Sequence, residues 1–279
     1  MNYPDAELVA NVRNHARNMR RHIIRMLAAA KSGHTAGSLD LADIIASLYF
    51  GAMNFDEAND GASRDLLVLS NGHTVPVLYA AMAEKGLLST DELMTLRQFG
   101  SRLQGHPERM MLPQLETTSG PLGEGLSQAA GMAYSLKYLD FQLNRRVYCI
   151  LGDGELDEGQ NWEAVMFAGK QGLSNLIAII DRNDIQLSGA TEDIIPLSRM
   201  SAVWLSHGWQ VITVDDGNDV DQIMLALASA KQADKPVVII AHTLPGKGVS
   251  FMEGDYHWHG KVPSPDQAEQ ALAELGGND

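Results

Sequence analysis

The sequence has very little of several features that define special classes of protein. Cys149 is the only cysteine, which excludes a disulfide framework and leaves too few thiolates for a cysteine-based zinc site. Basic residues are also scarce: 21 lysines and arginines stand against 35 acidic residues, giving a net charge of −14. This balance argues against a surface built to bind nucleic acid or anionic lipid.

Long hydrophobic runs are missing as well. No stretch approaches the roughly 20 apolar residues that a membrane span needs. Residues 1–7 are polar, and no apolar segment followed by small residues indicates a signal peptide. Of the 279 residues, 45% are hydrophobic and 20% charged. We therefore expect a soluble cytoplasmic protein, without membrane or nucleic-acid partners, that is long enough for one large domain with a real core.

Short apolar runs alternate with helical patterns along the chain. The runs that we expect to be strands lie at 65–70, 147–151, 176–180, 209–214 and 237–241. Helices are expected over 5–31, 39–50, 89–99 and 158–172. Another is expected after 215–218 and ends near 231, and a last one begins at Ser264-Pro265. Ser89 and Glu92 fit a capping box. The pattern predicts an α/β fold, a doubly wound parallel sheet of about five strands with helices on both faces.

Polar residues directly follow two of these strands. Gly152-Asp-Gly-Glu155 ends the second run and Asp181-Arg-Asn183 ends the third. Asp153 and Asn183 are 30 residues apart, about one βαβ unit, so we expect both side chains at the same edge of the sheet, where such folds bind ligands. Carboxylate and amide oxygens suit Mg²⁺, and the glycines flanking Asp153 would let a diphosphate approach the backbone.

Each half of this pair is more often a structural turn when it occurs alone, but the two together are much more specific. The pair resembles the thiamine diphosphate motif, and the segments around it resemble transketolases. The segments that carry the resemblance occur in the transketolase order and cover nearly the whole chain: 32–34 (SGH), 69–73 (LSNGH), 105–107 (GHP), 120–125 (GPLGEG), 152–159 (GDGELDEG), 175–183 (NLIAIIDRN) and 258–260 (WHG).

The resemblance implies a metal site and a cofactor site. Mg²⁺, with Ca²⁺ or Mn²⁺ as expected substitutes, would be held by the side chains of Asp153 and Asn183 and the backbone carbonyl of Ile185. The implied residues for binding thiamine diphosphate are Gly120, Pro121, Leu122, Gly152, Asp153, Gly154, Glu155, Glu158, Glu163, Asn183, Ile185 and Lys247. Pro121 also suits the first position of a helix, which predicts a helix start with free N–H groups for an anion or a polar cofactor atom.

Two of these residues, Glu158 and Glu163, have a simpler explanation too, because acidic residues in a first helical turn interact favourably with the helix dipole. The resemblance instead places both in a hydrogen-bonded network at a subunit interface near the cofactor. Lys247 would contact the diphosphate as a point charge.

Four of the nine histidines stand in glycine-containing loops and are the catalytic candidates: His34, His73, His106 and His259. Histidine titrates near neutral pH, and the resemblance places these four around the thiazolium and the donor sugar, as proton-transfer and hydroxyl-binding groups. A structural role remains the alternative for each. A zinc cluster is less favoured, because no tight His-x₃-His pair with a carboxylate is present.

Two positions depart from the family pattern. Thr35 follows the first motif histidine, where the family commonly has proline, and Glu124 stands where full-length members often have glutamine. Neither change touches the predicted metal ligands. The loss of proline changes the stiffness of the loop after His34 and so bears on the donor pocket, and both changes leave the exact substrate open.

Transketolases are more than twice as long as this chain, which matches only their first domain. We therefore expect residues 1–279 to form a single domain that binds thiamine diphosphate and Mg²⁺, with 243–279 as a loop-rich tail closing on the cofactor. The resemblance implies the N-terminal subunit of a split transketolase. A separate C-terminal subunit would supply the pyrimidine-binding part, in an α2β2 heterotetramer.

The implied reaction is transfer of a two-carbon glycolaldehyde unit from a ketose phosphate to an aldose phosphate, as in the pentose phosphate pathway. Alternatives are a subunit similar to 1-deoxyxylulose-5-phosphate synthase or to the E1 α chain of 2-oxo acid dehydrogenases, or a non-catalytic paralogue. The loop histidines favour sugar transfer over the dehydrogenase. A nicotinamide dehydrogenase is disfavoured, since no Gly-x-Gly-x-x-Gly opens a strand–helix turn.

Overall fold

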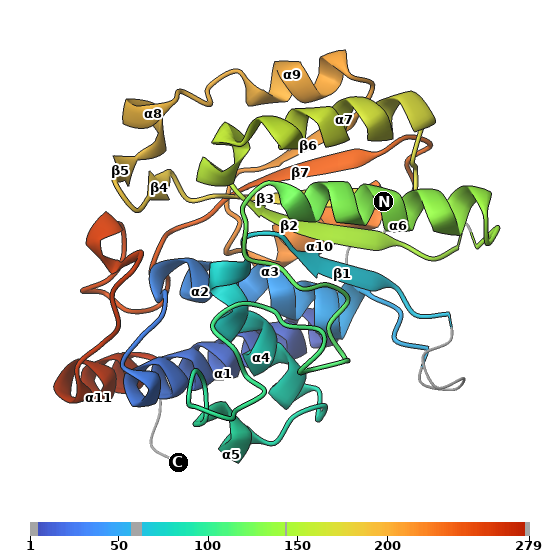
Figure 1. Ribbon diagram of the computed structural model, residues 1–279. Helices are drawn as coiled ribbons and strands as arrows, with labels where there is room; N and C mark the ends of the chain where they lie inside the picture. Colours follow the sequence, from blue (N-terminus) through green and yellow to red (C-terminus); the bar gives the residue numbers. More distant parts are fainter. Residues whose placement is uncertain (1–4, 57–62, 143, 277–279) are drawn as a thin grey trace.

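A parallel five-stranded sheet forms the centre of the computed structural model, which describes residues 5–56, 63–142 and 144–276 (Figure 1). The strands lie in the order β1-β2-β3-β7-β6. Their bounds are β1 Leu66–Leu69, β2 Val147–Gly152, β3 Leu176–Arg182, β6 Gln210–Val214 and β7 Val237–His242. The predicted α/β fold and its five parallel strands are confirmed.

The strand residues alternate between two hydrophobic cores, one on each face of the sheet. In β2, Tyr148 and Ile150 belong to one core, while Val147, Cys149 and Leu151 belong to the other. Since successive side chains of a strand point to opposite faces, a strand covered on both sides must be apolar throughout. This explains why the strands appear in the sequence as unbroken apolar runs.

Helices cover each face. One core is closed by α1 (Ala6–Ala30), α3 (Ala42–Ser47), α4 (Val75–Glu84) and α10 (Val220–Ala230). The other is closed by α6 (Glu124–Tyr138), α7 (Gly159–Gln171) and α9 (Met200–Ser206). In Figure 1, α9 and α7 lie at the top and α6 lies below them at the right.

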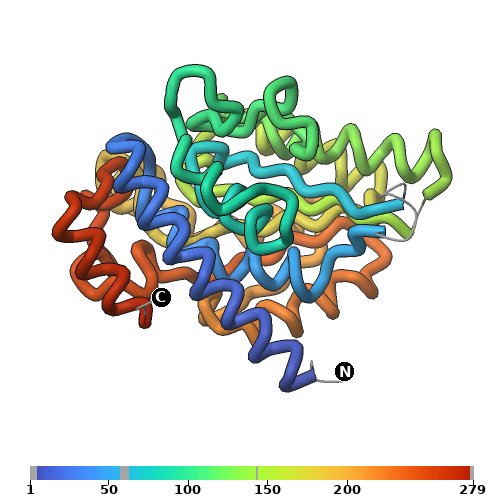
Figure 2. The backbone as a smooth tube through the Cα atoms, turned by 90° about the horizontal axis from the view of Figure 1, so that it is seen from below, coloured from blue at the N-terminus to red at the C-terminus, as the bar shows by residue number. Residues whose placement is uncertain are grey.

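Shorter elements connect these layers. They are α2 (Ala36–Asp40), a π turn (Leu48–Ala52), α5 (Thr90–Leu93), α8 (Thr191–Ile194), α11 (Pro265–Glu274), 3₁₀ turns at Gly72–Thr74, Gly154–Asp157 and Tyr256–Trp258, and the antiparallel pair β4 (Ile185–Gln186) and β5 (Gly189–Ala190). The last helix, α11, packs against α1, and in Figure 2 the red α11 lies beside the blue helix α1 on the left, away from the N-terminus of α1.

The predicted capping box at Ser89 does not form. The Ser89 hydroxyl accepts a hydrogen bond from the Asp91 N–H (3.2 Å), but the Glu92 carboxylate pairs with Arg102 instead of returning to the cap. Helix α5 ends at Leu93, well short of the predicted 99, and Arg97 beyond it has a left-handed backbone (φ 58°) that an α-helix cannot continue through. The Glu92 carboxylate is thus used in an ion pair ten residues away and not in the predicted capping box.

Two other predicted helices had different outcomes. The helix expected over 39–50 begins earlier, at Ala36, and is divided at Leu41, whose ψ of −8° interrupts the regular α-helix. The last helix begins as predicted, with Pro265 in its first turn and a capping box between Ser264 and Gln267.

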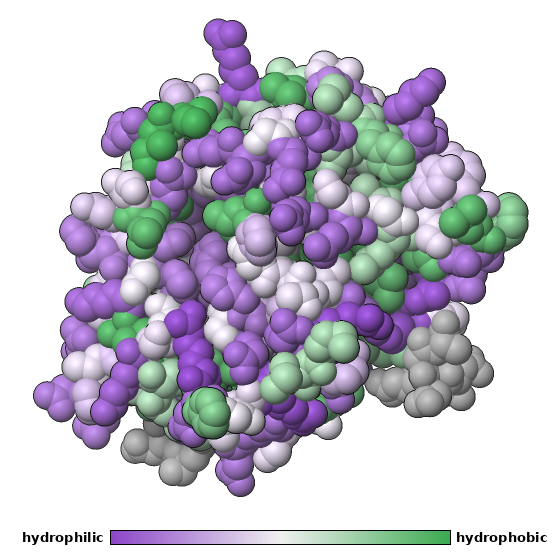
Figure 3. Space-filling view, viewed as in Figure 1, coloured by the Kyte–Doolittle hydropathy of each residue, from purple (hydrophilic) through white to green (hydrophobic). Residues whose placement is uncertain are grey.

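No helix in the described ranges combines the length and the apolar character needed to cross a membrane. Figure 3 shows mainly hydrophilic residues over the face seen in Figure 1, with separate hydrophobic patches. Some large apolar side chains are nevertheless well exposed, including Phe99 (109%), Met110 (85%) and Leu187 (69%).

Two helical glycines provide a matched test of the packing between α7 and its neighbours. A Cβ at Gly169 would lie 1.8 Å from the His207 carbonyl oxygen, whereas a Cβ at Gly131 meets nothing within 4 Å. We expect Gly169→Ala to lower the free energy of unfolding by about 2 kcal/mol or more. Gly131→Ala should raise it by about 0.5–1 kcal/mol through the higher helix propensity of alanine. Urea unfolding of the two variants measures both changes, and equal effects would contradict the close approach at Gly169.

Candidate active site

The carboxyl ends of β2 and β3 lie side by side at the bottom of a cavity of about 420 Å³. Gly152 pairs with Asp181 in the parallel register, so Asp153 and Asn183 reach the same edge of the sheet, and both line the cavity. The two side chains that the 30-residue spacing predicted to share an edge do so.

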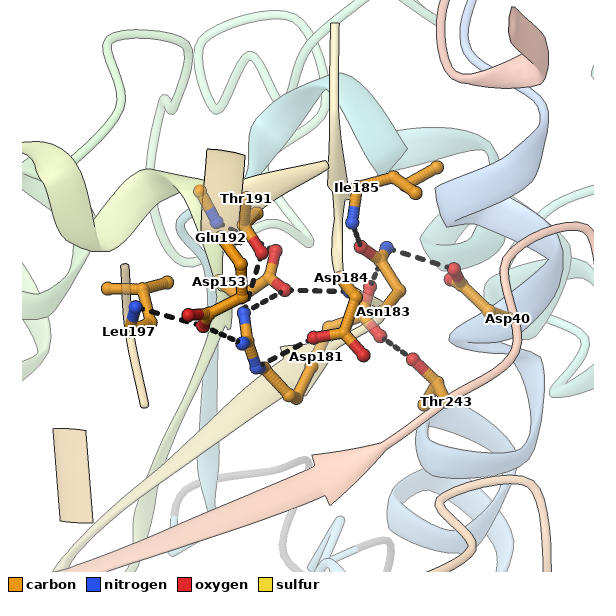
Figure 4. A network of polar contacts seen from close by, with 12 residues as sticks. Asp40, Asp153, Asp181, Asn183, Asp184, Ile185, Thr191, Glu192, Leu197 and Thr243 are labelled. Carbon is orange, nitrogen blue, oxygen red and sulfur yellow. Dashed lines mark hydrogen bonds and ion pairs between the residues drawn. The ribbon is translucent and has the colours of Figure 1, made fainter. Parts of the chain in front are cut away.

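Asp153 is held by donors on both of its oxygens. Its side chain is only 2% exposed. Oδ2 accepts hydrogen bonds from Arg182 Nη1 (3.0 Å) and the Asp184 N–H (2.8 Å), and Oδ1 accepts one from the Gly154 N–H (2.7 Å), as Figure 4 shows in part. Burial raises the pKa of Asp153 to about 6, although the Arg182 charge and these hydrogen bonds oppose the rise.

Asn183 is oriented by two carboxyl groups. Its Nδ2 donates to Asp40 Oδ2 (3.0 Å) and Asp181 Oδ2 (3.1 Å), and its Oδ1 accepts from the Ile185 N–H (3.1 Å) (Figure 4). Because the nitrogen is fixed between two acceptors, the amide oxygen must face the side on which Ile185 lies.

The two carboxyl groups behind Asn183 are themselves buried. Burial raises the pKa of Asp40 well above its usual value and that of Asp181 to about 7, and the neighbouring charge of the other carboxylates adds to both shifts. Thr243 donates its hydroxyl to Asp181 Oδ1. With Asp153, this makes three buried carboxyl groups within one network.

This donor set fits a divalent cation. The Asp153 carboxylate, the Asn183 amide oxygen and the Ile185 carbonyl are hard oxygen donors of the kind that Mg²⁺ prefers, and a cation would offset the buried negative charge. Among the described residues, no three His, Cys, Asp or Glu side chains group as metal ligands would. A metal at this edge must therefore use amide and carbonyl oxygens as well.

The four candidate histidines come from four separate loops and all line the cavity. The ring centres of His34 and His73 are 4.9 Å apart, those of His73 and His259 5.2 Å, and those of His34 and His259 5.8 Å. Distant parts of the sequence thus supply a single cluster of imidazoles, with His106 on the same cavity wall.

Burial lowers the pKa of each of these histidines. For His34 it falls to about 4, with a further contribution from the nearby charges of His259 and Arg97. The imidazoles are therefore neutral at pH 7 and able to accept a proton. Nδ1 of His34, Nδ1 of His259 and Oδ1 of Asn71 are buried without a hydrogen-bond partner among the described residues, which leaves them available to a ligand.

The 120–125 segment differs from the prediction. Helix α6 begins at Glu124, after Gly123 in a left-handed conformation (φ 87°), so Pro121 is not its first residue. The Gly123 N–H donates to Glu155 Oε1 (2.7 Å) and the Gly125 N–H to Ser70 Oγ (3.1 Å). These two N–H groups are satisfied within the chain and do not form the predicted free anion site.

Glu155 fastens this segment to the sheet. Besides Gly123, its carboxylate accepts hydrogen bonds from the Ser70 hydroxyl (2.5 Å) and the Gly152 N–H (3.2 Å). Burial raises the pKa of Glu155 to about 7 even though these donors favour the charged form. One carboxylate therefore connects the ends of β1 and β2 with the start of α6.

Comparison with known proteins agrees with this geometry. Residues 12–279 match the family model described as transketolase, thiamine diphosphate binding domain. The chain belongs to the transketolase family.

Individual relatives define which part of a transketolase it resembles. It is 39% identical to the 6-deoxy-6-sulfo-D-fructose transketolase subunit SqwG of a Clostridium species, over 97% of this chain and 98% of that protein. It is 38% identical to one subunit of the apulose-4-phosphate transketolase of Phocaeicola vulgatus, over 92% of this chain and 90% of that one. This chain therefore corresponds to the N-terminal subunit of a transketolase. The transketolase activity predicted from the motifs is confirmed.

Full-length transketolases show the same relation. Human transketolase is 38% identical over 98% of this chain but only 43% of its own length. The solved transketolase of Leishmania mexicana superposes with a TM-score of 0.90 at 33% identity, covering 96% of this chain and 41% of that one. The transketolase subunit thus spans about two fifths of the length of these relatives.

Most residues predicted from the transketolase motifs lie around the cavity. The lining includes His34, His73, His106, His259, Gly120, Leu122, Gly152, Asp153, Gly154, Glu155, Glu158, Asn183 and Ile185. Pro121, Glu163 and Lys247 do not line it: Glu163 is exposed on α7 and Lys247 is half-buried.

The sequence-based prediction missed several site residues. Asp181 and Arg182 stand within the recognised motif beside Asn183, and their position directly after the predicted strand run 176–180 was the available signal. In the structure they are the last two residues of β3. Asp40 lies 143 positions from its partner Asn183, inside a helical pattern, and nothing in the sequence singles it out. Gln186, Leu187 and Ser188 join the lining because the β4–β5 hairpin folds over the cavity.

One departure from the family pattern has a visible consequence. Thr35, at the position where transketolases commonly have proline, donates its hydroxyl to the Lys261 carbonyl (2.6 Å). This bond joins the loop after His34 to the tail that carries His259, so two of the site histidines are fixed relative to each other.

The neutral state of the histidines can be tested by titration. Because the folded pKa of His34 lies below the unfolded value of about 6.5, the folded chain resists protonation, and this residue alone would make stability fall as the pH drops from 6.5 toward 4. The raised pKa values of Asp153 and Glu155 act in the opposite direction, so global stability is a poor readout. NMR of the imidazole protons, with His34→Gln to assign the signal, should give a midpoint near 4. A midpoint near 6.5 would contradict the burial of His34.

Proposed function

We propose that this transketolase subunit binds thiamine diphosphate through Mg²⁺ in the cavity at the ends of β2 and β3, and that a separate C-terminal subunit completes the active site. The observation that carries the proposal is the meeting of Asp153, Asn183 and four neutral histidines around one cavity. The first pair suits a metal-bound diphosphate, and the histidines suit a polyhydroxylated substrate.

The backbone near Asp153 is suited to a close ligand. A Cβ at Gly152 would make only an ordinary contact, 3.7 Å from Asn71 Cβ, and its φ is not positive. Neither packing nor backbone conformation therefore requires glycine there. A diphosphate approaching the backbone would require it, since a side chain would occupy that space.

When bound, thiamine diphosphate would supply the nucleophilic carbon needed for transfer of a glycolaldehyde unit from a ketose phosphate to an aldose phosphate. Asp153, Asn183 and the Ile185 carbonyl would hold Mg²⁺. Nδ1 of His34 and of His259 are free to hydrogen-bond substrate hydroxyls, and the neutral imidazoles can accept and return a proton during transfer.

Exposed apolar side chains at the cavity, and at a neighbouring pocket that shares His106 with it, support the proposed partner. Leu187 lines the cavity and yet is 69% exposed, and Met110 beside the His106 loop is 85% exposed. Such side chains are typical of a surface that another chain covers. The names of the two relatives, each a transketolase subunit, support a two-chain enzyme, for which we propose α2β2 stoichiometry and a cytoplasmic setting.

The proposed substrates are a ketose donor and an aldose acceptor that carry an anionic group, in sugar metabolism of the pentose phosphate type. The two relatives are named for 6-deoxy-6-sulfo-D-fructose and apulose 4-phosphate, which share that chemistry.

The metal assignment predicts a strong effect of Asp153→Asn. The change keeps the shape of the side chain but removes the charge of a ligand, so we expect the affinity for thiamine diphosphate with Mg²⁺ to fall about 100-fold or more. Asp65→Asn is the matched control, because Asp65 is equally buried at the opposite edge of the sheet, where it accepts from the Asn54 and Arg146 N–H groups. Calorimetric titration of each variant, assembled with the C-terminal subunit, measures both affinities, and undiminished affinity in Asp153→Asn would overturn the assignment.

The two-chain proposal predicts that activity depends on a partner. The isolated subunit should show no transfer between ketose and aldose phosphates, and addition of the C-terminal subunit should produce it, with light scattering giving a mass of two copies of each chain. Transfer by this chain alone, or no transfer with any sugar phosphate after the two chains assemble, would contradict the proposal. The second outcome would favour a non-catalytic paralogue.

A further inference from the structure

Arg182, the last residue of β3, is a buried cation that joins the proposed metal ligand to the wall of the cavity. Its side chain is only 7% exposed. Nη1 donates to Asp153 Oδ2 (3.0 Å) and Thr191 Oγ1 (2.8 Å), and Nη2 donates to Glu192 Oε1 (2.6 Å). Nε pairs with Asp184 Oδ1 (2.9 Å). All three guanidinium nitrogens are therefore engaged.

The four acceptors belong to two different parts of the fold. Asp153 directly follows β2, whereas Asp184, Thr191 and Glu192 belong to the segment 184–197, which contains the β4–β5 hairpin and α8. Figure 4 shows Asp153, Asp184, Thr191 and Glu192 arranged around one centre. A single planar guanidinium can reach all four because its donors point in fixed, divergent directions.

Within the segment 184–197, further hydrogen bonds involve three of the residues that Arg182 contacts, Asp184, Thr191 and Glu192. The Thr191 N–H donates to the Asp184 carbonyl (3.0 Å), and the Leu197 N–H donates to Glu192 Oε1 (3.0 Å). The same segment supplies Ile185, Gln186, Leu187 and Ser188 to the cavity lining. Its placement over the cavity therefore depends on acceptors that Arg182 holds.

The charges on either side of Arg182 differ in burial. The Asp153 side chain is 2% exposed, while Asp184 and Glu192 are 59% and 43% exposed. The inner contact is a desolvated ion pair, which is lost at high cost if one partner is removed, whereas the outer pairs are screened by water and weaker. Arg182 is thus firmly attached at Asp153 and more loosely attached at the segment.

We propose that Arg182 is a positioning residue that couples metal binding at Asp153 to the placement of the segment 184–197 over the cofactor cavity. This inference rests on the proposed function, because it takes Asp153 as a metal ligand. Arg182 occupies Oδ2 and fixes the plane of the carboxylate, while Oδ1 accepts only the Gly154 N–H among the described residues. A metal that binds the oriented carboxylate would also stabilise the segment attached to the same guanidinium.

The test uses this chain assembled with its C-terminal subunit, because the proposed cofactor site needs both chains. Thiamine diphosphate and Mn²⁺ are added, and the Mn²⁺ is followed by electron paramagnetic resonance. In Arg182→Lys, an ammonium cannot reach all four acceptors, so we expect Mn²⁺ affinity to fall about tenfold or more. Hydrogen exchange should show that Mn²⁺ with the cofactor protects the amides of 184–197 in the wild type, and that this gain is lost in the variant.

Two further variants separate coupling from general destabilisation. Glu192→Gln weakens only the outer attachment, so protection of the segment should decrease with a smaller loss of Mn²⁺ affinity than in Arg182→Lys. Arg64→Lys disrupts the two-point ion pair with Glu116 at the other end of the sheet and should change neither readout.

The outcomes are distinct for the two proposals. If the wild type binds Mn²⁺ while Arg182→Lys is folded and binds it as tightly or more tightly, the inference about Arg182 is overturned and the proposed function stands. If the wild type binds no Mn²⁺, the proposed metal site itself fails. Should Arg182→Lys not fold, unchanged protection and unchanged affinity in Glu192→Gln would overturn the coupling.

Discussion

The parallel pairing of β2 with β3 is the constraint on which the site depends. Its register places Gly152 opposite Asp181, and the Asp153 N–H donates to the Asp181 carbonyl (3.1 Å) just where the strands end. Since both faces of the sheet are buried, a slip by one residue would exchange the side chains of the two cores and is strongly disfavoured. The packing of the two hydrophobic cores on β2 and β3 therefore brings Asp153 and Asn183 to one edge of the sheet.

Beyond the ends of β2 and β3, the chain buries carboxyl and imidazole groups, and buried polar groups are stable only when other polar groups contact them. Three carboxyl groups, Asp40, Asp153 and Asp181, share one network, and burial raises the pKa of each. Around the same cavity, burial lowers the pKa of the histidines and keeps them neutral. The buried carboxyl groups favour a cation, and the neutral imidazoles favour hydroxyl groups. One cavity therefore offers a part suited to a metal ion and a part suited to a sugar.

The parts of the site that the sequence predicted correctly are those governed by local patterns. Asp153 and Asn183 directly follow apolar runs, and a residue that ends a buried parallel strand has a nearly fixed position. The predicted position of Pro121 was wrong, because Gly123 turns the chain and Glu155, from a different segment, takes the N–H that a free helix start would have offered. Arg102 similarly removed Glu92 from its expected capping role.

The sequence by itself determined the sheet and the two strand ends that carry Asp153 and Asn183, because hydrophobic periodicity is a local property of the chain. Its motifs also resembled those of transketolases, a family that the comparisons confirm. Tertiary structure alone decided that Asp40 orients Asn183, that Thr35 fixes the loop after His34 to the tail, and that Arg182 connects Asp153 with the segment 184–197. These contacts join residues whose separation along the chain says nothing about their distance, since the folding of the intervening layers sets it.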